Sequence, residues 1–221
     1  MILRVVSLLF FATVSLAQTG TSPCATLPGS IPMPTVSKLP DPFTFLNGTR
    51  VTTRDQWACR REEIRALVQR FELGPMPPKP SSVTGTLSGG TLTVKVTDRG
   101  KSISFTASIK TPTSGKAPYP AIIAYGDGSI PIPANVATIS YNNFDVGADL
   151  DRGKGKFYDI YGSSNSAGAM VAWAWGASRI IDALETLPNA NIDTTKIGIT
   201  GCSRNGKGAL VGGSSLSAYT S

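Results

Sequence analysis

One short segment near the end of the sequence combines residue types that can do chemistry. Residues Gly201–Gly208 read GCSRNGKG and follow Lys196–Thr200 (KIGIT), a short apolar run typical of a strand. A serine on a tight turn between a strand and a helix forms a nucleophile elbow, which presents its hydroxyl above the sheet. We therefore interpret Ser203 as the candidate catalytic nucleophile.

The neighbours of this serine fit the elbow in part. Gly201 is the small residue expected two positions earlier, whereas Asn205 stands where the common G-x-S-x-G pattern has glycine. Asparagine adopts unusual backbone angles more readily than most residues, and Gly206 follows it. Arg204 carries a permanent charge and can donate to an oxyanion; its alternative is a surface salt bridge. A second oxyanion donor is expected at Tyr125–Gly128, after a buried strand.

Two other interpretations compete for the same segment. Gly201, Gly206 and Lys207 match the phosphate-loop pattern G-x-x-x-x-G-K, but Gly208 stands where that pattern needs Ser or Thr for Mg²⁺. An ordinary glycine-rich turn before a helix is the third interpretation. We expect Lys207 to donate to hydroxyl groups rather than to act as a base, with a solvated helix residue as its alternative.

The 221 residues contain no histidine. Histidine is the usual general base for a serine nucleophile and a common metal ligand. In α/β hydrolases the acid and the histidine follow the serine in the sequence, but this chain ends soon after Ser203. We therefore expect a truncated or altered C-terminus, and neither a metal nor a cofactor.

The elements that must position this segment are predicted from hydrophobic periodicity. A capping box at Thr53–Gln56 predicts a helix over Asp55–Leu73, which Gly74 ends. Alternation predicts a hairpin of Thr91–Thr97 and Ser102–Lys110. The remaining expected elements are strands at Ala121–Tyr125, Val136–Tyr141 and Lys196–Thr200, helices at Ala167–Leu187 and from Gly206, and a turn at Ile192–Thr195. This order indicates the α/β class, with a mixed, mostly parallel sheet.

The start of the sequence is typical of a signal peptide over Met1–Ala17. Arg4 provides the positive charge, Val5–Val14 is apolar but too short to span a bilayer, and Ser15–Ala17 offers small residues for cleavage. A buried N-terminal helix is the alternative. No other segment is apolar enough to cross a membrane, so we expect a soluble, secreted protein.

The expected domain plan follows from composition. Residues 18–52 are rich in Pro, Thr and Ser and predict an extended arm, with an N-glycosylation sequon at Asn47. Residues 53–211 predict a partial α/β catalytic domain, and residues 212–221 a low-complexity tail.

The three cysteines are an odd number, which is unusual in a secreted protein. A bond between Cys24 and Cys59 would tie the arm to the first helix and leave Cys202 without a partner. The net charge of +7 suggests nucleic acid, but the signal peptide and the scattered basic residues argue against it. An acidic extracellular polymer is the better candidate. The loop residues Arg152, Lys154 and Lys156 form either a basic rim for such a polymer or a plain solvated loop.

Several segments together resemble the fungal glucuronoyl esterases, also called 4-O-methyl-glucuronoyl methylesterases, of carbohydrate esterase family 15. Besides Gly201–Gly208, the segments that carry the resemblance are Leu39–Phe45, Thr53–Ile64, Pro131–Ile139, Arg152–Ser164 and Ala172–Glu185. The resemblance covers about residues 24 to 211. It implies an α/β-hydrolase fold with three αβα layers, and cleavage of the ester between 4-O-methyl-glucuronic acid on glucuronoxylan and lignin alcohols.

The resemblance also implies residue roles. It makes Ser203 the nucleophile, Arg204 the stabiliser of the oxyanion and Lys207 a ligand of sugar hydroxyls. It implies a disulfide between Cys24 and Cys59. Cys202 matches a cysteine that is normally bonded to one beside the catalytic histidine.

After Val211 the sequence departs from this family, whose catalytic acid and histidine come later. We therefore expect the chain to be inactive by itself. We also expect it to be a monomer. The alternatives are a non-catalytic carbohydrate-binding protein, a fragment from a gene-model or splicing error that does not fold, or another plant-cell-wall esterase of the acetyl xylan esterase or cutinase-like type.

Overall fold

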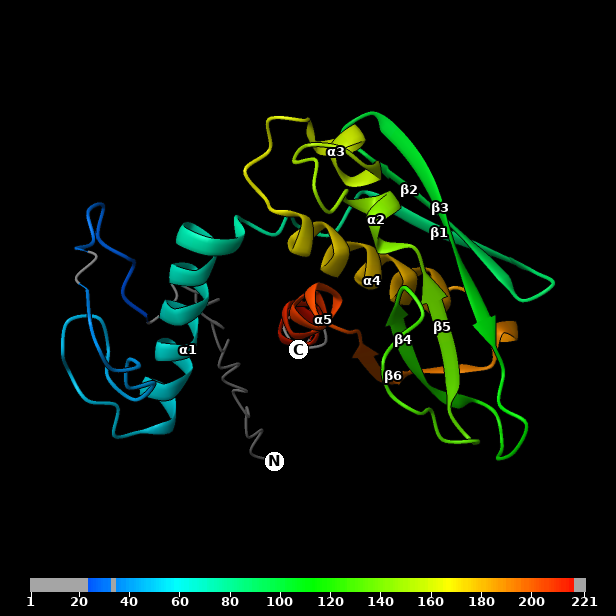
Figure 1. Cartoon of the computed structure of the whole chain (residues 1–221), viewed down its shortest axis with the longest axis horizontal. Coiled ribbons are helices and arrows are strands. Elements are labelled where there is room, and N and C mark those ends of the chain that lie inside the picture. The colour runs from blue at the N-terminus through cyan, green and yellow to red at the C-terminus, as the bar shows by residue number, and fades with distance from the viewer. Residues whose placement is uncertain (1–23, 33–34, 217–221) are drawn as a thin grey trace, which may run out of the picture. The chain divides into compact units, whose positions relative to one another are not determined.

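The computed structural model describes residues 24–32 and 35–216. The predicted signal peptide and the last residues of the predicted tail lie outside these ranges. The chain divides into two compact units, residues 1–65 and 66–221, and the boundary falls inside helix α1 (Figure 1). None of the described helices is long and apolar enough to cross a membrane.

Helix α1 (Arg54–Val68) begins at the predicted capping box. The backbone N–H of Gln56 donates to Thr53 Oγ1, and the backbone N–H of Thr53 donates to Gln56 Oε1, both at 3.2 Å. This reciprocal pair satisfies donors that the first turn of a helix leaves open. A π-helical segment, Gln69–Leu73, follows α1, and Gly74 ends it with a φ of 78°. The predicted helix over Asp55–Leu73 is therefore confirmed.

The N-terminal unit is held together by covalent and polar contacts with α1. A disulfide joins Cys24 to Cys59, as the family resemblance implied. The buried Arg60 pairs with Glu63, and its Nε donates to the carbonyl of Pro42 at 3.2 Å. A disulfide of this kind is typical of proteins from oxidising compartments.

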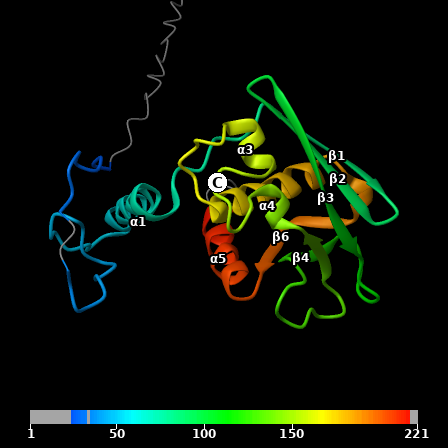
Figure 2. The ribbon, with the colours of Figure 1, turned by 45° about the horizontal axis from the view of Figure 1, so that its top comes forward.

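Six strands form one mixed sheet in the second unit (Figures 1 and 2). They are β1 (Ser82–Ser88), β2 (Thr91–Asp98), β3 (Lys101–Lys110), β4 (Tyr119–Tyr125), β5 (Ala137–Tyr141) and β6 (Ile192–Thr200). The order across the sheet is β1-β2-β3-β5-β4-β6. The first four in this order pair antiparallel, while β4 pairs parallel to both β5 and β6. The predicted hairpin and the predicted α/β class are confirmed. The prediction of a mostly parallel sheet was wrong for the described strands, because three of the pairings are antiparallel and two are parallel.

Strand β1 was missing from the sequence prediction. Its inward positions include Gly85, where an added Cβ would lie 2.7 Å from Leu187 Cδ1. Close packing therefore favours a glycine at this position, but glycine weakens the alternation on which strand prediction depends.

The turn predicted at Ile192–Thr195 was wrong, because these residues begin β6. The register shifts between the pairs Tyr119–Ile192 and Ala121–Ile197, so the residues between them bulge out of the ladder. Within this irregular stretch, hydrogen bonds from Lys196 and Thr195 lower the pKa of Asp193 to about 2. Such local polar bonding is turn chemistry, which explains why the sequence suggested a turn.

The helices of this unit are α2 (Asn143–Val146), α3 (Lys156–Tyr161), α4 (Ala169–Glu185) and α5 (Arg204–Leu216), with a short 3₁₀ turn, Pro188–Ala190. Helix α4 confirms the prediction over Ala167–Leu187. The short α2 and α3 were not predicted, and Lys156 begins α3 instead of lying in a loop. Helix α5 starts earlier than expected and continues beyond Val211, where Gly212 is buried.

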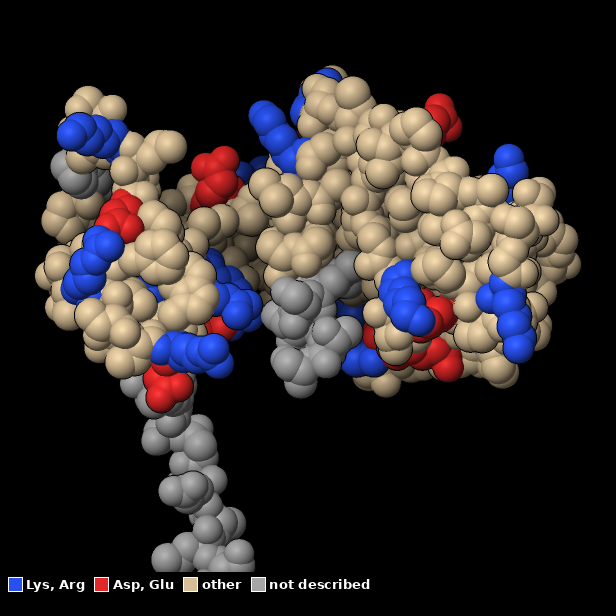
Figure 3. Space-filling model, turned by 90° about the horizontal axis from the view of Figure 1, so that it is seen from below, with Lys and Arg blue, Asp and Glu red and all other residues tan. Residues whose placement is uncertain are grey.

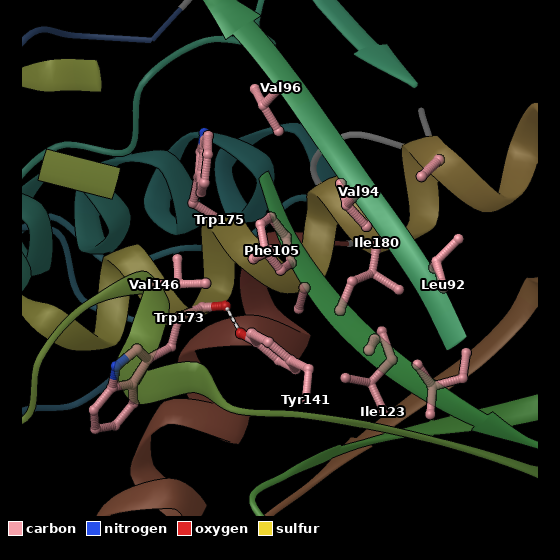
Figure 4. Close-up of a cluster of buried hydrophobic side chains, with 14 of the residues drawn as sticks. Leu92, Val94, Val96, Phe105, Ile123, Tyr141, Val146, Trp173, Trp175 and Ile180 are labelled. Atoms are coloured by element: carbon pink, nitrogen blue, oxygen red, sulfur yellow. Dashed lines mark hydrogen bonds between the residues drawn. The ribbon is translucent and has the colours of Figure 1, made fainter. Parts of the chain in front are cut away.

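The core lies between α4 and one face of the sheet (Figure 4). Its largest fully buried side chains include Trp173 and Trp175 of α4. The Trp175 ring packs against Phe157 and Tyr161, and the Trp173 ring packs against Tyr125 and Phe144. The hydroxyl of Tyr141 donates to the backbone carbonyl of Trp173. Burial raises the pKa of Tyr141 well above its ordinary value, so the phenol stays protonated and keeps this bond.

Two glycines of α5 provide a matched test of this packing. A Cβ at Gly208 would lie 2.6 Å from Trp173 Cε3, whereas a Cβ at Gly213 would meet no atom within 4 Å. We expect Gly208→Ala to lower the free energy of unfolding by about 1–3 kcal/mol through overpacking. Gly213→Ala should raise it by up to about 1 kcal/mol, because alanine is the better helix former. Urea unfolding of both variants measures the difference; equal effects would contradict this close approach of α5 to α4.

Candidate active site

Ser203 lies on the turn between β6 and α5, as the elbow predicts. Its φ is +55°, a left-handed conformation that is uncommon for a residue with a Cβ. Its side chain is exposed, and its backbone carbonyl accepts the N–H of Lys207 at 3.1 Å in the first turn of α5. Strained backbone of this kind clusters at functional sites. The turn therefore presents the hydroxyl at the start of a helix.

The elbow needs a glycine at position 201 for a steric reason. A Cβ on Gly201 would lie 2.5 Å from the backbone oxygen of Asn205, closer than atoms can approach. At Gly206 an added Cβ would lie 3.1 Å from the Gly201 oxygen. The requirement for small residues, which the sequence analysis inferred from the pattern, is thus borne out by the backbone geometry.

Asn205 has a different role from the one expected. It is not among the described residues with positive φ; the strained residue is Ser203. Its side chain instead joins the start of α2 to the end of β4. Its Oδ1 accepts from Nδ2 of the buried Asn143 at 2.9 Å, and its Nδ2 donates to the Tyr125 carbonyl at 3.4 Å. The asparagine therefore fixes the start of α5 against the sheet.

The segment Tyr125–Gly128 lies beside the elbow, since a Cβ on Gly126 would meet Asn205 Nδ2 at 3.4 Å. The N–H of Gly126 donates to the Tyr141 carbonyl at 3.3 Å, and the N–H of Gly128 donates to the Tyr125 carbonyl at 3.4 Å. These two glycine N–H groups are engaged within the protein, which does not favour either of them as the expected second oxyanion donor.

Arg204, directly after the serine, forms an ion pair whose partner was not predicted from the sequence. Its Nη1 lies 2.9 Å from Oδ2 of Asp149, in the segment between α2 and α3. The Arg204 side chain is 55% exposed and that of Asp149 only 17%. The surface salt bridge considered as the alternative role of Arg204 is thus present, but its acidic partner is largely shielded. Guanidinium N–H groups remain available for an oxyanion, because the group has five of them.

The other predicted site residues are distributed over both units. Lys207 is exposed on the first turn of α5, close in sequence to Ser203. Cys202 is an exposed free thiol. Asn47 and the Cys24–Cys59 disulfide belong to the N-terminal unit. Asn143 and Asp149 carried no sequence signal, because each meets the elbow only through the folding of distant segments.

A mixed sheet with a serine on a strand–helix turn in its parallel half is the arrangement of the α/β hydrolases. Within that class, the chain belongs to the fungal glucuronoyl esterase family: the family model described as "Glucuronyl esterase, fungi" matches residues 94–216. Members of this family are carboxylic ester hydrolases.

Individual relatives agree with this assignment. The 4-O-methyl-glucuronoyl methylesterase of Hypocrea jecorina is 59% identical over 197 residues, which are 88% of this chain and 43% of the relative. The catalytic domain of the Hypocrea jecorina glucuronoyl esterase has a TM-score of 0.80 at 60% identity, covering 85% of this chain and 52% of that one.

A second solved structure contains a ligand. It is a serine-to-alanine variant of the Sporotrichum thermophile glucuronoyl esterase in complex with methyl 4-O-methyl-β-D-glucopyranuronate. Its TM-score is 0.77 at 54% identity, covering 83% of this chain and 52% of that chain. The present chain thus spans less than half of the Hypocrea jecorina curated relative and about half of the two solved structures.

Proposed function

We propose that this chain provides the nucleophile and the oxyanion-stabilising arginine of an esterase that cleaves 4-O-methyl-glucuronoyl esters between glucuronoxylan and lignin alcohols. The observation that carries the proposal is the exposed Ser203 with its left-handed backbone at the start of α5. The family assignment and the methyl glucuronate ester bound by the Sporotrichum thermophile relative support the substrate class.

The proposed reaction begins with attack of Ser203 Oγ on the ester carbonyl carbon. The carbonyl oxygen then gains negative charge, which the Arg204 guanidinium stabilises with hydrogen bonds. Loss of one such donor costs about 10²–10³ in kcat in serine hydrolases. Collapse of the intermediate expels the alcohol and leaves an acyl-serine, which water hydrolyses. Lys207, with three donors on its ammonium, is assigned to sugar hydroxyl groups.

The serine proton requires a base, and the 221 residues contain no histidine. An unassisted serine hydroxyl is a weak nucleophile near neutral pH. We therefore propose that these 221 residues do not turn over ester by themselves. Catalysis is tested in a chimera that joins two pieces. Residues 1–216 of this chain come first, and the C-terminal part of the Hypocrea jecorina relative that has no counterpart in this chain follows them. The family resemblance implies that this part supplies the acid and the histidine.

The substrate class is tested by comparing two esters with the chimera. We expect hydrolysis of a methyl 4-O-methyl-glucuronate ester with a kcat/KM at least about 10-fold above that for an acetyl xylose ester, because the uronic acyl group carries hydroxyls for Lys207 and an acetyl group carries none. The 221-residue chain serves as the control and should hydrolyse neither ester. Faster release of acetate would favour an acetyl xylan esterase, and turnover by the control would refute its proposed inactivity.

The absence of histidine also favours a second function, that of a non-catalytic carbohydrate-binding protein. The exposed lysines and arginines would then contact the acidic groups of glucuronoxylan. On the face in Figure 3, however, Lys and Arg side chains are scattered and several adjoin acidic groups. Retention of the 221-residue chain on a glucuronoxylan column that is lost at high salt would support the binding function. A chain that is not retained would refute it.

We also propose that the protein is secreted after cleavage of Met1–Ala17 and glycosylated at Asn47. The Cys24–Cys59 disulfide is consistent with an oxidising compartment. Asn47 is exposed in a local turn, where its Oδ1 accepts the N–H of Thr49 at 2.9 Å. Intact mass spectrometry of the protein from a fungal culture medium, before and after glycosidase, tests both points. A mass that includes residues 1–17 and no glycan would contradict them.

A further inference from the structure

The segment of residues 147–155, here called the 147–155 loop, is fixed at both ends by close backbone contacts. At its start, Trp173 Nε1 donates to the carbonyl of Gly147 at 2.6 Å. At its end, a Cβ on Gly155 (φ +113°) would lie 2.6 Å from the carbonyl oxygen of Val146. The hydrogen bond anchors the start of the loop on α4, and the close approach of Gly155 to Val146 leaves no room for a larger residue at its end.

The middle of the 147–155 loop is fixed as well. The N–H of Ala148 donates to the Lys154 carbonyl at 2.9 Å, which closes the loop on itself. A Cβ on Gly153 (φ +82°) would lie 2.3 Å from the backbone oxygen of Ser163. Arg152 Nη2 donates to the carbonyl of Ser166 at 2.8 Å. Asp149 is therefore presented from a backbone whose neighbours restrict its movement on several sides.

From this fixed loop, the largely shielded carboxylate of Asp149 reaches the Arg204 guanidinium at 2.9 Å. An ion pair between two mobile exposed side chains contributes little, because both must be ordered. Here one partner is already held in place, so the pair orders the other. The ordered group is the guanidinium that directly follows Ser203.

We propose that Asp149 is a positioning residue that fixes the Arg204 guanidinium beside the elbow serine. The inference rests on the proposed role of Arg204 and adds a residue to it. A preorganised donor stabilises developing charge better than one that must be ordered during the reaction. The ion pair places Nη1 against Oδ2, and a guanidinium has further N–H groups that can face an oxyanion.

The first experiment measures the order of the Arg204 side chain in the 221-residue chain by ¹⁵N relaxation of its Nε–Hε group, identified by its loss in Arg204→Lys. The test variant is Asp149→Asn. The matched control is Asp151→Asn, because Asp151 lies in the same loop but is 63% exposed and pairs with Lys154. We expect an order parameter near about 0.85 in the parent and in Asp151→Asn, falling below about 0.6 in Asp149→Asn.

This measurement can overturn the proposal without any catalysis. Equal order in the parent and in Asp149→Asn, or an equal loss in Asp151→Asn, would remove the positioning role. Asp149→Glu keeps the charge and is expected to retain part of the order. The variants are compared at matched folded fractions, established from thermal unfolding, so that a general loosening of the fold is recognised.

A second experiment in the chimera separates this proposal from the proposed function. Asp149→Asn should lower kcat about 10-fold with KM within twofold, and should have no further effect when Arg204 is already alanine. An ordered Arg204 in a chimera that cleaves no glucuronate ester would leave the positioning role intact and refute the function. Equal kinetic effects of Asp149→Asn with and without Arg204 would refute the positioning role while leaving the function intact.

Discussion

Ser203→Ala in the chimera is expected to reduce kcat for a methyl glucuronate ester by at least about 10³-fold, with KM within about twofold. The hydroxyl forms the covalent bond to the acyl carbon, so its loss removes the first chemical step. The binding contacts of Lys207 and Arg204 remain. Steady-state kinetics on the purified variant measures both parameters.

Ser214→Ala is the matched control, since Ser214 is an exposed serine within α5. Its hydroxyl donates to the Val211 carbonyl at 3.0 Å within the same helix, away from the elbow turn. This variant should keep the kcat of the parent chimera. Substantial turnover by the Ser203→Ala chimera would refute the assignment of the nucleophile.

The left-handed backbone of Ser203 leads to a separate prediction about stability. Ser203→Gly also lacks the hydroxyl, but glycine adopts a φ of +55° without the steric cost that alanine retains. We expect Ser203→Gly to be more stable than Ser203→Ala by about 0.5–1 kcal/mol in urea unfolding, although both are inactive. Equal stability would mean that the elbow stores no strain at this position.

The sequence was sufficient where the signal is local. The elbow, the capping box at Thr53–Gln56 and the helix α4 each depend on residues within one or two turns of one another, and all three are present. The hairpin of β2 and β3 follows from simple alternation in the same way. The Cys24–Cys59 bond spans 35 residues and came from the family resemblance, not from local pattern.

The sequence was insufficient where distant segments meet. Asn143 and Asp149 contact Asn205 and Arg204 across more than fifty residues of chain, and neither sits in a recognisable motif. The same reason explains the mistaken role of Asn205. Its backbone tolerance could be judged from residue type, whereas the two hydrogen bonds that occupy its amide depend on how β4 and β5 end beside α5.

Trp173→Ala is expected to lower the free energy of unfolding by about 3–5 kcal/mol. The side chain is fully buried, with ring centroids 6.4 Å from Tyr125 and 5.4 Å from Phe144. Truncation leaves a cavity that the close approach of Gly208 cannot fill without moving α5. Urea unfolding measures the loss. Trp57→Ala is the control, because Trp57 is half-buried in the N-terminal unit. We expect this variant to lose less free energy of unfolding than Trp173→Ala.

The more discriminating variant is Trp173→Phe, which keeps most of the ring but removes the donor to Gly147. We expect a smaller loss of about 1–3 kcal/mol, because the buried carbonyl of Gly147 loses its partner. The 147–155 loop loses one anchor in both variants, so the order of the Arg204 side chain should fall in Trp173→Phe as well as in Asp149→Asn. The Trp173–Gly147 hydrogen bond in the core and the Asp149–Arg204 ion pair at the surface would then both affect the order of the same guanidinium, because the loop connects them. An Arg204 side chain that stays ordered in Trp173→Phe would show that the loop is held without this anchor.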